Sequence, residues 1–483
     1  MNELIYVNGD EEARSRMRRL QRLGKVRQVV PKVYATGTKE TDAAIVKRNL
    51  WAMIDRLYPN SLLSHRSALE FQPSPEGVLY LTRDARRTIR WPGVTLKYKD
   101  GPPALTDDNP LRGSLRASSL ERALLENLGD YRQSGGERRS VDQSVVEDRL
   151  AQVLNSRGEQ GLNELRDRAR EIAEELDWQK EFDRLNGLVA ALLTTGAVSK
   201  LTSSSAVAIA TGRPYDSARV TLFERLAGEL RLARPANRPA KTTNPTAFRN
   251  FAFFESYFSN YIEGTTFRVD EARKIIDEGA IIPLRHEDSH DVRETFALCS
   301  DRREMQRTPA SFDELVSLLR RRHNQLMHAR PYLLPGAFKV KANRAGNTYF
   351  VHPKQVLGTL EQAFHVYRTL PEGYVRALFI MFVLSEVHPF EDGNGRIARL
   401  FMNAELTSAG QSKLIIPTIY RDDYLLNLRR LTRKNDAPAY LRMMDRAHAF
   451  SHWLDPADYD TLKQQLELSN AFEEEEAVLR FPS

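Results

Sequence analysis

The sequence predicts a mainly α-helical protein, preceded by a smaller α/β region at its N-terminal end. Apolar residues recur at helical spacing through most of the chain after residue 118, which is typical of packed helices. Before that point, β-branched runs at 78–82 and 93–98 predict strands. One hairpin signal interrupts the later helices, where extended segments at 338–341 and 349–351 flank the turn-rich residues 343–347.

The composition excludes several classes of protein. Of the 483 residues, 28% are charged and 41% are hydrophobic, a balance typical of folded rather than disordered chains. The net charge of +7 permits an anionic partner but is too small to demonstrate one. The single cysteine, Cys299, excludes an internal disulfide framework and any cysteine-based zinc cluster.

No membrane span or secretory signal is expected. The longest apolar run, at 377–384, has eight residues, whereas a spanning helix needs about 20. The first residues, MNELI, contain neither a basic segment nor an apolar one. We therefore expect a cytoplasmic protein that does not contact a membrane.

Changes in composition along the chain predict its domain boundaries. Residues 231–246, RLARPANRPAKTTNPT, contain three prolines and few apolar anchors, which is typical of a linker. The expected regions are a winged-helix-like α/β region (1–115), a helical region (116–230), the linker (231–246), the main helical domain (247–455) and a C-terminal helix with an acidic tail that includes 473–476 (456–483).

A strongly basic helix is expected near the N-terminus. The segment from Arg14 to Lys32 holds eight basic residues, and Met17 and Leu20 would give its helix an apolar side. Valine-rich strands around Pro31 then predict a small hairpin. A basic helix followed by a hairpin is how a DNA-recognition helix and its wing are arranged. The alternative is a solvated basic face on an ordinary helix.

Two stretches of this first half resemble the antitoxin-type regulators of abortive-infection systems. They are LQRLGKVRQVVPKVYATG at 20–37 and SSLERALLENL at 118–128. The resemblance implies a winged helix followed by a mixed α/β domain. Only about ten residues precede the basic helix, so the earlier helices of a winged helix are shortened or missing.

The stretch most informative about chemistry is 388–399, HPFEDGNGRIAR. An apolar segment at 374–384 leads into it and is expected to be a core helix. Pro389 breaks that helix next to His388, so the imidazole should sit on a stiff loop, where it can act as a general base. Phe390 is expected to be the buried anchor of this loop.

The same stretch predicts a site for phosphate groups. Gly393, Asn394 and Gly395 allow backbone N–H groups to converge, and a helix is expected to begin near Arg396. Arg396 and Arg399 are three residues apart and share one side of the first turn, an arrangement that fits a polyphosphate.

One carboxylate in this loop needs a different explanation, since it would repel phosphate. Asp392 makes sense if it holds a divalent metal, most simply Mg²⁺, that bridges phosphate oxygens. The loop therefore predicts phosphoryl or nucleotidyl transfer. A lone histidine before proline, or a lone Gly-Asn-Gly, is usually structural. That alternative loses weight because all these features fall within twelve residues.

The stretch matches His-x-Phe-x-Asp/Glu-Gly-Asn-Gly-Arg-x-x-Arg at every fixed position, and over about 246–452 the chain resembles Fic-domain proteins. The resemblance implies a helical Fic core, with a β-hairpin flap beside the target-binding groove that contains Tyr349, Phe350 and Val351. Most Fic enzymes transfer AMP from ATP to a Ser, Thr or Tyr hydroxyl of a protein.

The resemblance also implies a role for each residue of the loop. His388 would remove the proton from the target hydroxyl, and Asp392 would bind Mg²⁺ at the phosphates. The nucleotide-binding residues would be Phe390, Gly393, Asn394, Gly395, Arg396 and Arg399, with the Gly-Asn-Gly turn as the anion hole and Arg399 at the γ-phosphate.

A second motif lies N-terminal to the loop. Ser259, Glu263 and Gly264 match the inhibitory pattern of the same family, Ser/Thr-x-x-x-Glu-Gly/Asn. The first two are four residues apart and so share one side of a helix. By resemblance, Glu263 would pair with Arg399 and occupy the γ-phosphate site. The alternative is an exposed carboxylate at the end of a helix.

We therefore expect a protein adenylyltransferase that uses ATP and Mg²⁺ and is inhibited by its own Glu263. Its partners would be ATP and a hydroxyl of a target protein, with the chain itself as one candidate. Alternative activities are transfer of phosphate or phosphocholine and removal of AMP. Another is a DNA-binding regulator whose Fic core only senses nucleotide. Nucleic acid bound through Arg14–Lys32 and a second copy in a homo-oligomer also stay open as partners.

Overall fold

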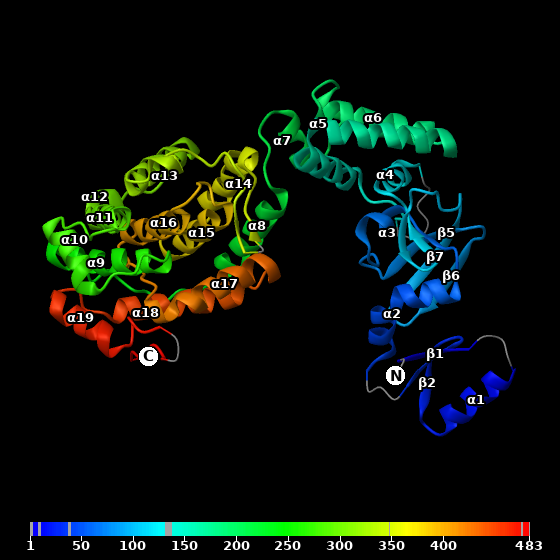
Figure 1. The fold of residues 1–483 in the computed structure, drawn as a ribbon, viewed down its shortest axis with the longest axis horizontal. Helices are drawn as coiled ribbons and strands as arrows, with labels where there is room; N and C mark the ends of the chain where they lie inside the picture. Colours follow the sequence, from blue (N-terminus) through cyan, green and yellow to red (C-terminus); the bar gives the residue numbers. More distant parts are fainter. Residues whose placement is uncertain are drawn as a thin grey trace. The chain divides into compact units, whose positions relative to one another are not determined.

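Two structural units divide the chain, and each has its own core. Unit 1 comprises Met1–Gly212 and unit 2 comprises Arg213–Ser483 in the computed structural model (Figure 1). The structure describes residues 3–7, 11–36, 40–130, 138–346, 348–474 and 477–482.

The domain boundary predicted at 231–246 is wrong. Helix α8 (Ser217–Leu232) belongs to unit 2, where its Phe223 is buried in the core. The proline-rich residues also lie in unit 2, and Pro239 forms a β-bridge with Gln411. The prolines correctly indicate irregular backbone, but only the packing of α8 shows which core it joins.

Residues 3–7 and 11–36 form a small sheet with one helix against it. Its elements are β1 (Leu4–Tyr6), α1 (Glu11–Arg22), β2 (Val26–Val30) and β3 (Val33–Thr36), in the sheet order β1-β3-β2. The structure thus contains the predicted basic helix and hairpin. Met17 is buried beneath α1, where it packs with Val7 and Val26.

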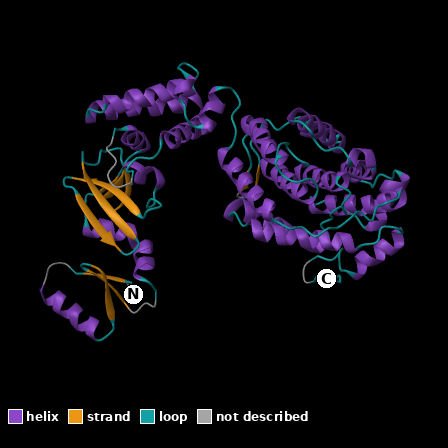
Figure 2. Ribbon diagram, turned by 180° about the vertical axis from the view of Figure 1, so that it is seen from behind, coloured by secondary structure: helices purple, strands orange, loops and turns teal. Residues whose placement is uncertain are grey.

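The middle of unit 1 is a six-stranded mixed sheet with helices beside it (Figure 2). The strands are β4 (Leu62–Leu63), β5 (Val78–Arg83), β6 (Arg87–Trp91), β7 (Val94–Asp100), β8 (Asn109–Arg112) and β9 (Leu115–Ala117), in the order β6-β7-β5-β4-β9-β8. Helices α2 (Asp42–Leu57) and α3 (His65–Glu70) accompany them. Leu79 and Leu96 on the sheet pack with Met53 of α2. The two predicted strands are β5 and β7.

Helices complete unit 1. They are α4 (Leu120–Leu128), α5 (Gln143–Leu176), α6 (Gln179–Leu192) and α7 (Ser204–Ala210), with a 3-10 turn, η1 (Val198–Lys200). Helix α5 is kinked at Gly158, whose φ of 71° suits a residue without a side chain.

Unit 2 is helical. After α8 come α9 (Pro245–Ile262), α10 (Val269–Glu278), α11 (His286–Ser300), α12 (Arg302–Met305), α13 (Phe312–Met327), α14 (Val356–Arg368), α15 (Tyr374–Val387), α16 (Asn394–Ser408), α17 (Arg421–Lys434), α18 (Ala437–Trp453) and α19 (Tyr459–Leu468), with 3-10 turns η2 (Pro331–Leu333), η3 (Pro353–Gln355) and η4 (Thr418–Tyr420). Helix α15 is buried on nearly all sides, because α8, α14 and α16 pack around it. None of the helices that the structure describes is both long and apolar enough to cross a membrane.

The hairpin lies later in the chain than predicted. Its strands are β10 (Arg344–Ala345) and β11 (Thr348–Tyr349). Residues 338–341 are not a strand. They run beside the 388–399 loop instead, where the Lys339 N–H donates to the Pro389 carbonyl at 2.9 Å. This contact joins segments that are distant in sequence, so the local pattern of 338–341 does not reveal it.

The end of the chain returns to unit 2 and is not simply a solvated tail. Phe472 stacks on Phe258 of α9, with ring centroids 5.3 Å apart. The Tyr261 hydroxyl of the same helix donates to the Glu474 carboxylate. The remainder of the predicted acidic run, residues 475–476, lies outside the described residues.

Candidate active site

The loop between α15 and α16 has the shape that its glycines and proline predict. Helix α15 ends at Val387, and His388 caps it with a left-handed φ of 51° ahead of Pro389. Gly393, with φ of 74°, precedes the first residue of α16. The Asn394 side chain closes the loop, because it accepts from the Phe390 N–H and donates to the Phe390 carbonyl, both at 2.9 Å. The amide of Asn394 therefore shapes the loop, while the first N–H groups of α16 stay available to an anion.

A buried histidine that the motif does not contain fixes this loop from behind. The His323 ring stacks on Phe390 with centroids 3.7 Å apart. The Gly336 N–H donates to His323 Nδ1, so Nε2 carries the ring proton and donates to the Asp392 carbonyl at 3.0 Å. Burial lowers the pKa of His323 to about 4, which keeps the ring neutral. Phe390 is thus the buried anchor, as predicted, and His323 is its support.

The imidazole of His388 has the protonation state of a base. Its Nδ1 lies 3.2 Å from the Ser385 carbonyl, which can only accept, so Nδ1 carries the proton and Nε2 presents a lone pair. Burial lowers its pKa to about 4, so the ring is neutral near pH 7. Phe350 of the flap lies flat on the ring, with centroids 3.7 Å apart and planes within 5°.

The three predicted flap residues have different surroundings. Tyr349 is exposed, Phe350 covers His388, and Val351 is buried. The Tyr349 carbonyl accepts a hydrogen bond from Arg219 of α8 at 2.8 Å. Pairing of a target segment with this strand edge would therefore have to displace Arg219.

Arg396 is held inside the protein by a carboxylate outside the motif. Its Nη1 lies 2.7 Å from Asp291 Oδ2 on α11, and both side chains are buried. Its Nε has no hydrogen-bond partner among the residues that the structure describes. A buried guanidinium with an unused donor at the start of a helix suits an anionic ligand.

Asp392 stands apart from other metal-binding side chains. Its side chain is 52% exposed and lies 4.0 Å from Arg396. The described residues contain no cluster of three or more His, Cys, Asp or Glu that could hold a metal ion by itself. One accessible carboxylate beside a phosphate site fits Mg²⁺, which usually binds through one or two carboxylates, water and substrate phosphates.

The predicted inhibitory residues meet Arg399. Arg399 Nη2 lies 2.7 Å from Glu263 Oε1, and its Nε donates to Ser259 Oγ at 3.0 Å. A Cβ atom built on Gly395 would lie 2.1 Å from that Glu263 oxygen. The carboxylate therefore lies directly against the Gly-Asn-Gly turn, and a larger residue at 395 would have to displace it. Gly264 follows with φ of 93° and lets the chain turn away.

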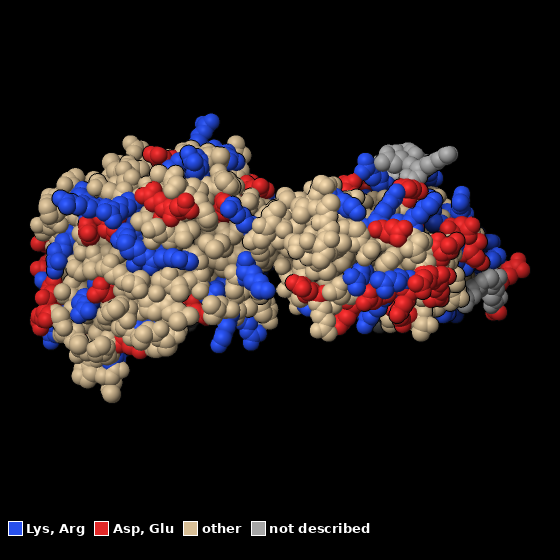
Figure 3. All heavy atoms as spheres, turned by 90° about the horizontal axis from the view of Figure 1, so that it is seen from above, with Lys and Arg blue, Asp and Glu red and all other residues tan. Residues whose placement is uncertain are grey.

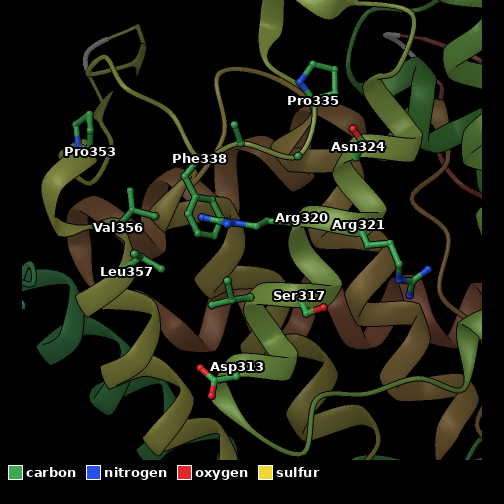
Figure 4. Close-up of a pocket in the computed structure, with 13 residues that line it drawn as sticks. Asp313, Ser317, Arg320, Arg321, Asn324, Pro335, Phe338, Pro353, Val356 and Leu357 are labelled. Carbon is green, nitrogen blue, oxygen red and sulfur yellow. The ribbon is translucent and has the colours of Figure 1, made fainter.

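A groove of about 960 Å³ lies next to this loop, between α13, residues 335–338 and the start of α14 (Figure 4). Arg320 lies across the Phe338 ring at 5.0 Å, and Phe338 in turn contacts Phe390, with ring centroids 5.3 Å apart. None of the residues that the motifs single out lines it. The groove is therefore a neighbouring feature and not the phosphate site.

The structure brings together every residue of the two motifs and adds partners that they do not contain. The additional residues are Arg219, Asp291, His323, the Ser385 carbonyl and Lys339. Buried Lys339 donates to the Val387 carbonyl at 3.3 Å, and burial lowers its pKa to about 8. Arg219, Asp291, His323 and Lys339 are distant from the loop in sequence and gave no local signal, while the Ser385 carbonyl is a backbone group that side-chain motifs do not reveal. Chemically, the site offers a neutral base, converging N–H groups and two arginines around one point.

Comparison with known proteins agrees with this geometry. Residues 313–406 match the Fic/DOC family. The chain is 32% identical to a Fido domain-containing protein of Dictyostelium discoideum, over 20% of this chain and 72% of that protein. The chain therefore belongs to the Fic/DOC family.

Among its relatives are proteins named protein adenylyltransferase. One, fic-1 of Caenorhabditis elegans, is 28% identical over 37% of this chain and 36% of its own length. Another, Fic of Nematostella vectensis, is 29% identical over 43% of this chain and 47% of its own. The match thus spans less than half of these adenylyltransferases.

Solved structures of Fic proteins also align. A Fic domain-containing signaling protein from Bacteroides thetaiotaomicron covers 51% of this chain and 98% of its own, at 19% identity and a TM-score of 0.39. Fic-1 from C. elegans covers 68% of this chain and 97% of its own, at 17% identity and a TM-score of 0.36.

Proposed function

We propose that this protein is an adenylyltransferase that transfers AMP from ATP to a hydroxyl of a protein. The observation that carries the proposal is the neutral His388, which presents Nε2 on the loop that also carries the Gly-Asn-Gly turn and the two arginines. The adenylyltransferase names of its relatives support the same reaction. A metal-free anion sensor would not need a base at this point.

In the proposed reaction each residue of the site has a separate role. His388 Nε2 takes the proton of the target hydroxyl, whose oxygen forms a bond to the α-phosphorus while the bond to the pyrophosphate oxygen breaks. The N–H groups at the start of α16 and the Arg396 guanidinium bind the phosphate charge. When bound, Mg²⁺ would be held by Asp392 and would neutralise phosphate oxygens. The remaining rate acceleration would come from holding ATP and the target hydroxyl in the correct orientation.

Glu263 would inhibit this reaction from within the chain. Its carboxylate lies against Gly395 and bonds Arg399, the two features that an entering γ-phosphate would need. Like charges repel, so the carboxylate and a phosphate cannot share this place. The exposed helix-end carboxylate is therefore the less favoured interpretation, because only 28% of the Glu263 side chain is exposed.

The test is intact-protein mass spectrometry after incubation with ATP and Mg²⁺. A mass increase of one adenylyl group on a Ser, Thr or Tyr supports the proposal. An increase of phosphate or phosphocholine, or loss of AMP from a modified protein, would assign the site to another Fic reaction. His388→Ala should abolish the transfer, since removing a base costs about 10²–10⁴-fold, yet keep ATP binding. Full activity in that variant would refute the role of His388.

A second candidate function is DNA binding through unit 1. Residues 11–32 contain eight basic and two acidic residues, a net charge of +6, whereas the whole chain carries +7. Arg18, Arg19 and Arg22 are exposed on α1, away from its buried Met17, and their side chains make no hydrogen bonds or ion pairs with other described residues. Along α5 and α6, in contrast, acidic and basic side chains are interspersed (Figure 3).

Fluorescence anisotropy with duplex DNA over a range of salt concentrations tests this candidate. Each phosphate contact contributes about 0.9 to the slope of log K against log salt. Replacing Arg18 and Arg22 by alanine should therefore reduce the slope by about 2. Replacing the exposed Arg429 and Arg442 of unit 2 changes the net charge by the same amount and should leave the slope unchanged. If both pairs of substitutions changed the slope equally, only a nonspecific attraction between the protein and DNA would remain, and this candidate would fail.

A further inference from the structure

Phe350 reaches His388 because of how the flap backbone is held. The Phe350 N–H donates inward to the Asn343 carbonyl at 3.2 Å, across the hairpin. Backbone groups of successive strand residues point to opposite sides, so the Tyr349 carbonyl points outward. There it accepts from Arg219 Nη2 at 2.8 Å. The residue that covers the imidazole is thus next in sequence to the point where the flap is tied to α8.

Arg219 is itself anchored by an ion pair. Arg219 Nε lies 2.6 Å from Glu386 Oε1 on α15, and the two side chains are 19% and 5% exposed. The other oxygen of Glu386 accepts from the Thr432 hydroxyl of α17 at 2.7 Å. Helix α8 packs along α14 and α15. A charged fork held by a buried carboxylate loses little freedom when it binds the flap.

Two arginines hold this strand, and the contacts of both with it are exposed. Arg433 Nη2 donates to the Thr348 hydroxyl at 2.8 Å, and Arg219 Nη2 donates to the Tyr349 carbonyl at 2.8 Å. Arg219 differs because its pair with Glu386 is largely shielded from water. Of the two arginines, Arg219 is therefore the better anchored, and it contacts the residue next to Phe350.

The imidazole needs two restraints to keep its orientation. The bond from Nδ1 to the Ser385 carbonyl fixes one edge of the ring, and the face contact with Phe350 fixes its plane. Together these two contacts fix the direction of the Nε2 lone pair. A base that is misplaced by about 1 Å can lose about 10²-fold in rate.

We infer that Arg219 is a positioning residue for His388, which it orients through the Tyr349 carbonyl and the ring of Phe350. This inference rests on the proposed function for its kinetic consequence, because only a transfer reaction uses the orientation of the base. Its structural part stands on the contacts alone. It also gives α8, the first helix of unit 2, a direct role in the site.

The experiment is NMR of histidine-labelled protein without ATP or target. A ring stacked face to face shifts the ring protons of its neighbour upfield, so the His388 signal, assigned with His388→Gln, should lie upfield of an ordinary histidine. Arg219→Ala should move it downfield, towards its position in Phe350→Leu. Arg225→Ala removes an exposed arginine side chain of the same helix that makes no hydrogen bond or ion pair with another described residue, and should leave the signal in place.

A matched set of outcomes decides the inference. If Arg219→Ala leaves the His388 signal in place although Phe350→Leu moves it, the inference is wrong. Arg219→Lys keeps the charge beside Glu386 but offers a single point donor, and should give an intermediate shift. Should Arg219→Ala not fold, Arg219→Lys and Arg219→Gln carry the same comparison.

Kinetics separate this inference from the proposed function. In a Glu263→Gly background, Arg219→Ala should lower kcat for AMP transfer by about 10-fold or more and leave KM for ATP unchanged. If no AMP transfer occurs in any variant, the proposed function fails, while the NMR result still tests the contact. If transfer occurs and kcat is unaffected, the positioning role fails alone.

Discussion

Replacing Glu263 by glycine should release the site for ATP. The carboxylate contacts Arg399 at 2.7 Å, and the two side chains are 28% and 6% exposed. A hydrogen bond between charged partners contributes about 1.5–3 kcal/mol, and about 1.36 kcal/mol corresponds to a tenfold change. The carboxylate must leave before a γ-phosphate can bind Arg399, so its removal should raise the rate of self-modification by about 10- to 150-fold.

The assay is transfer of label from ATP to the protein. ATP labelled at the α-phosphate reports AMP transfer, and ATP labelled at the γ-phosphate reports phosphate transfer. The control is Glu278→Gly, which removes an exposed carboxylate from the end of α10 and should change nothing. Arg399 keeps its two bonds to Ser259 in the variant, so the site should stay folded. A rate no higher than that of the unaltered protein would refute self-inhibition by Glu263.

Three further predictions concern pH and the support of the site. Because the pKa of His388 is about 4, the transfer rate of Glu263→Gly should not fall on acidification until well below pH 6, and an acid midpoint near 6.5 would contradict a buried base. Burial lowers the pKa of His323 to about 4, so this residue is protonated less readily in the folded protein than in the unfolded chain. Between about pH 6.5 and 4 the free energy of unfolding should therefore fall by about 1.4 kcal/mol per pH unit from this residue, and a His323→Gln variant should show a shallower dependence in chemical denaturation. Asp291→Asn should lower the free energy of unfolding by about 3–5 kcal/mol, measured the same way, because it leaves the buried Arg396 without its buried carboxylate partner. Asp288→Asn, at a partly exposed carboxylate, should cost far less, and equal costs would count against the buried pair.

The loop at 388–399 could be predicted as a candidate site because its parts are contiguous. Twelve residues contain the proposed base, the Gly-Asn-Gly turn, the two arginines and Asp392, and helical spacing alone puts Arg396 and Arg399 on one side. The pairing of Glu263 with Arg399 was predicted only through resemblance. Nothing in residues 259–264 themselves indicates which cation they meet.

The domain boundary and the flap show where local pattern fails. Residues 217–232 are an amphipathic helix whichever unit they join, so the proline-rich segment after them looked like a linker. The extended residues 338–341 pair with the loop at Pro389 and not with the flap, through contacts between segments about fifty residues apart. Local propensity describes such segments but not their partners.

By itself, then, the sequence determined the order of the helices, the residues of the candidate site from His388 to Arg399 and the family. The tertiary structure alone decided that Asp291 holds Arg396, that His323 supports Phe390, and that Arg219 ties the flap over the base. The physical reason is the same in each case. A side chain's type and spacing set what it can bond, but the partner that removes it from water is chosen only when distant segments pack together.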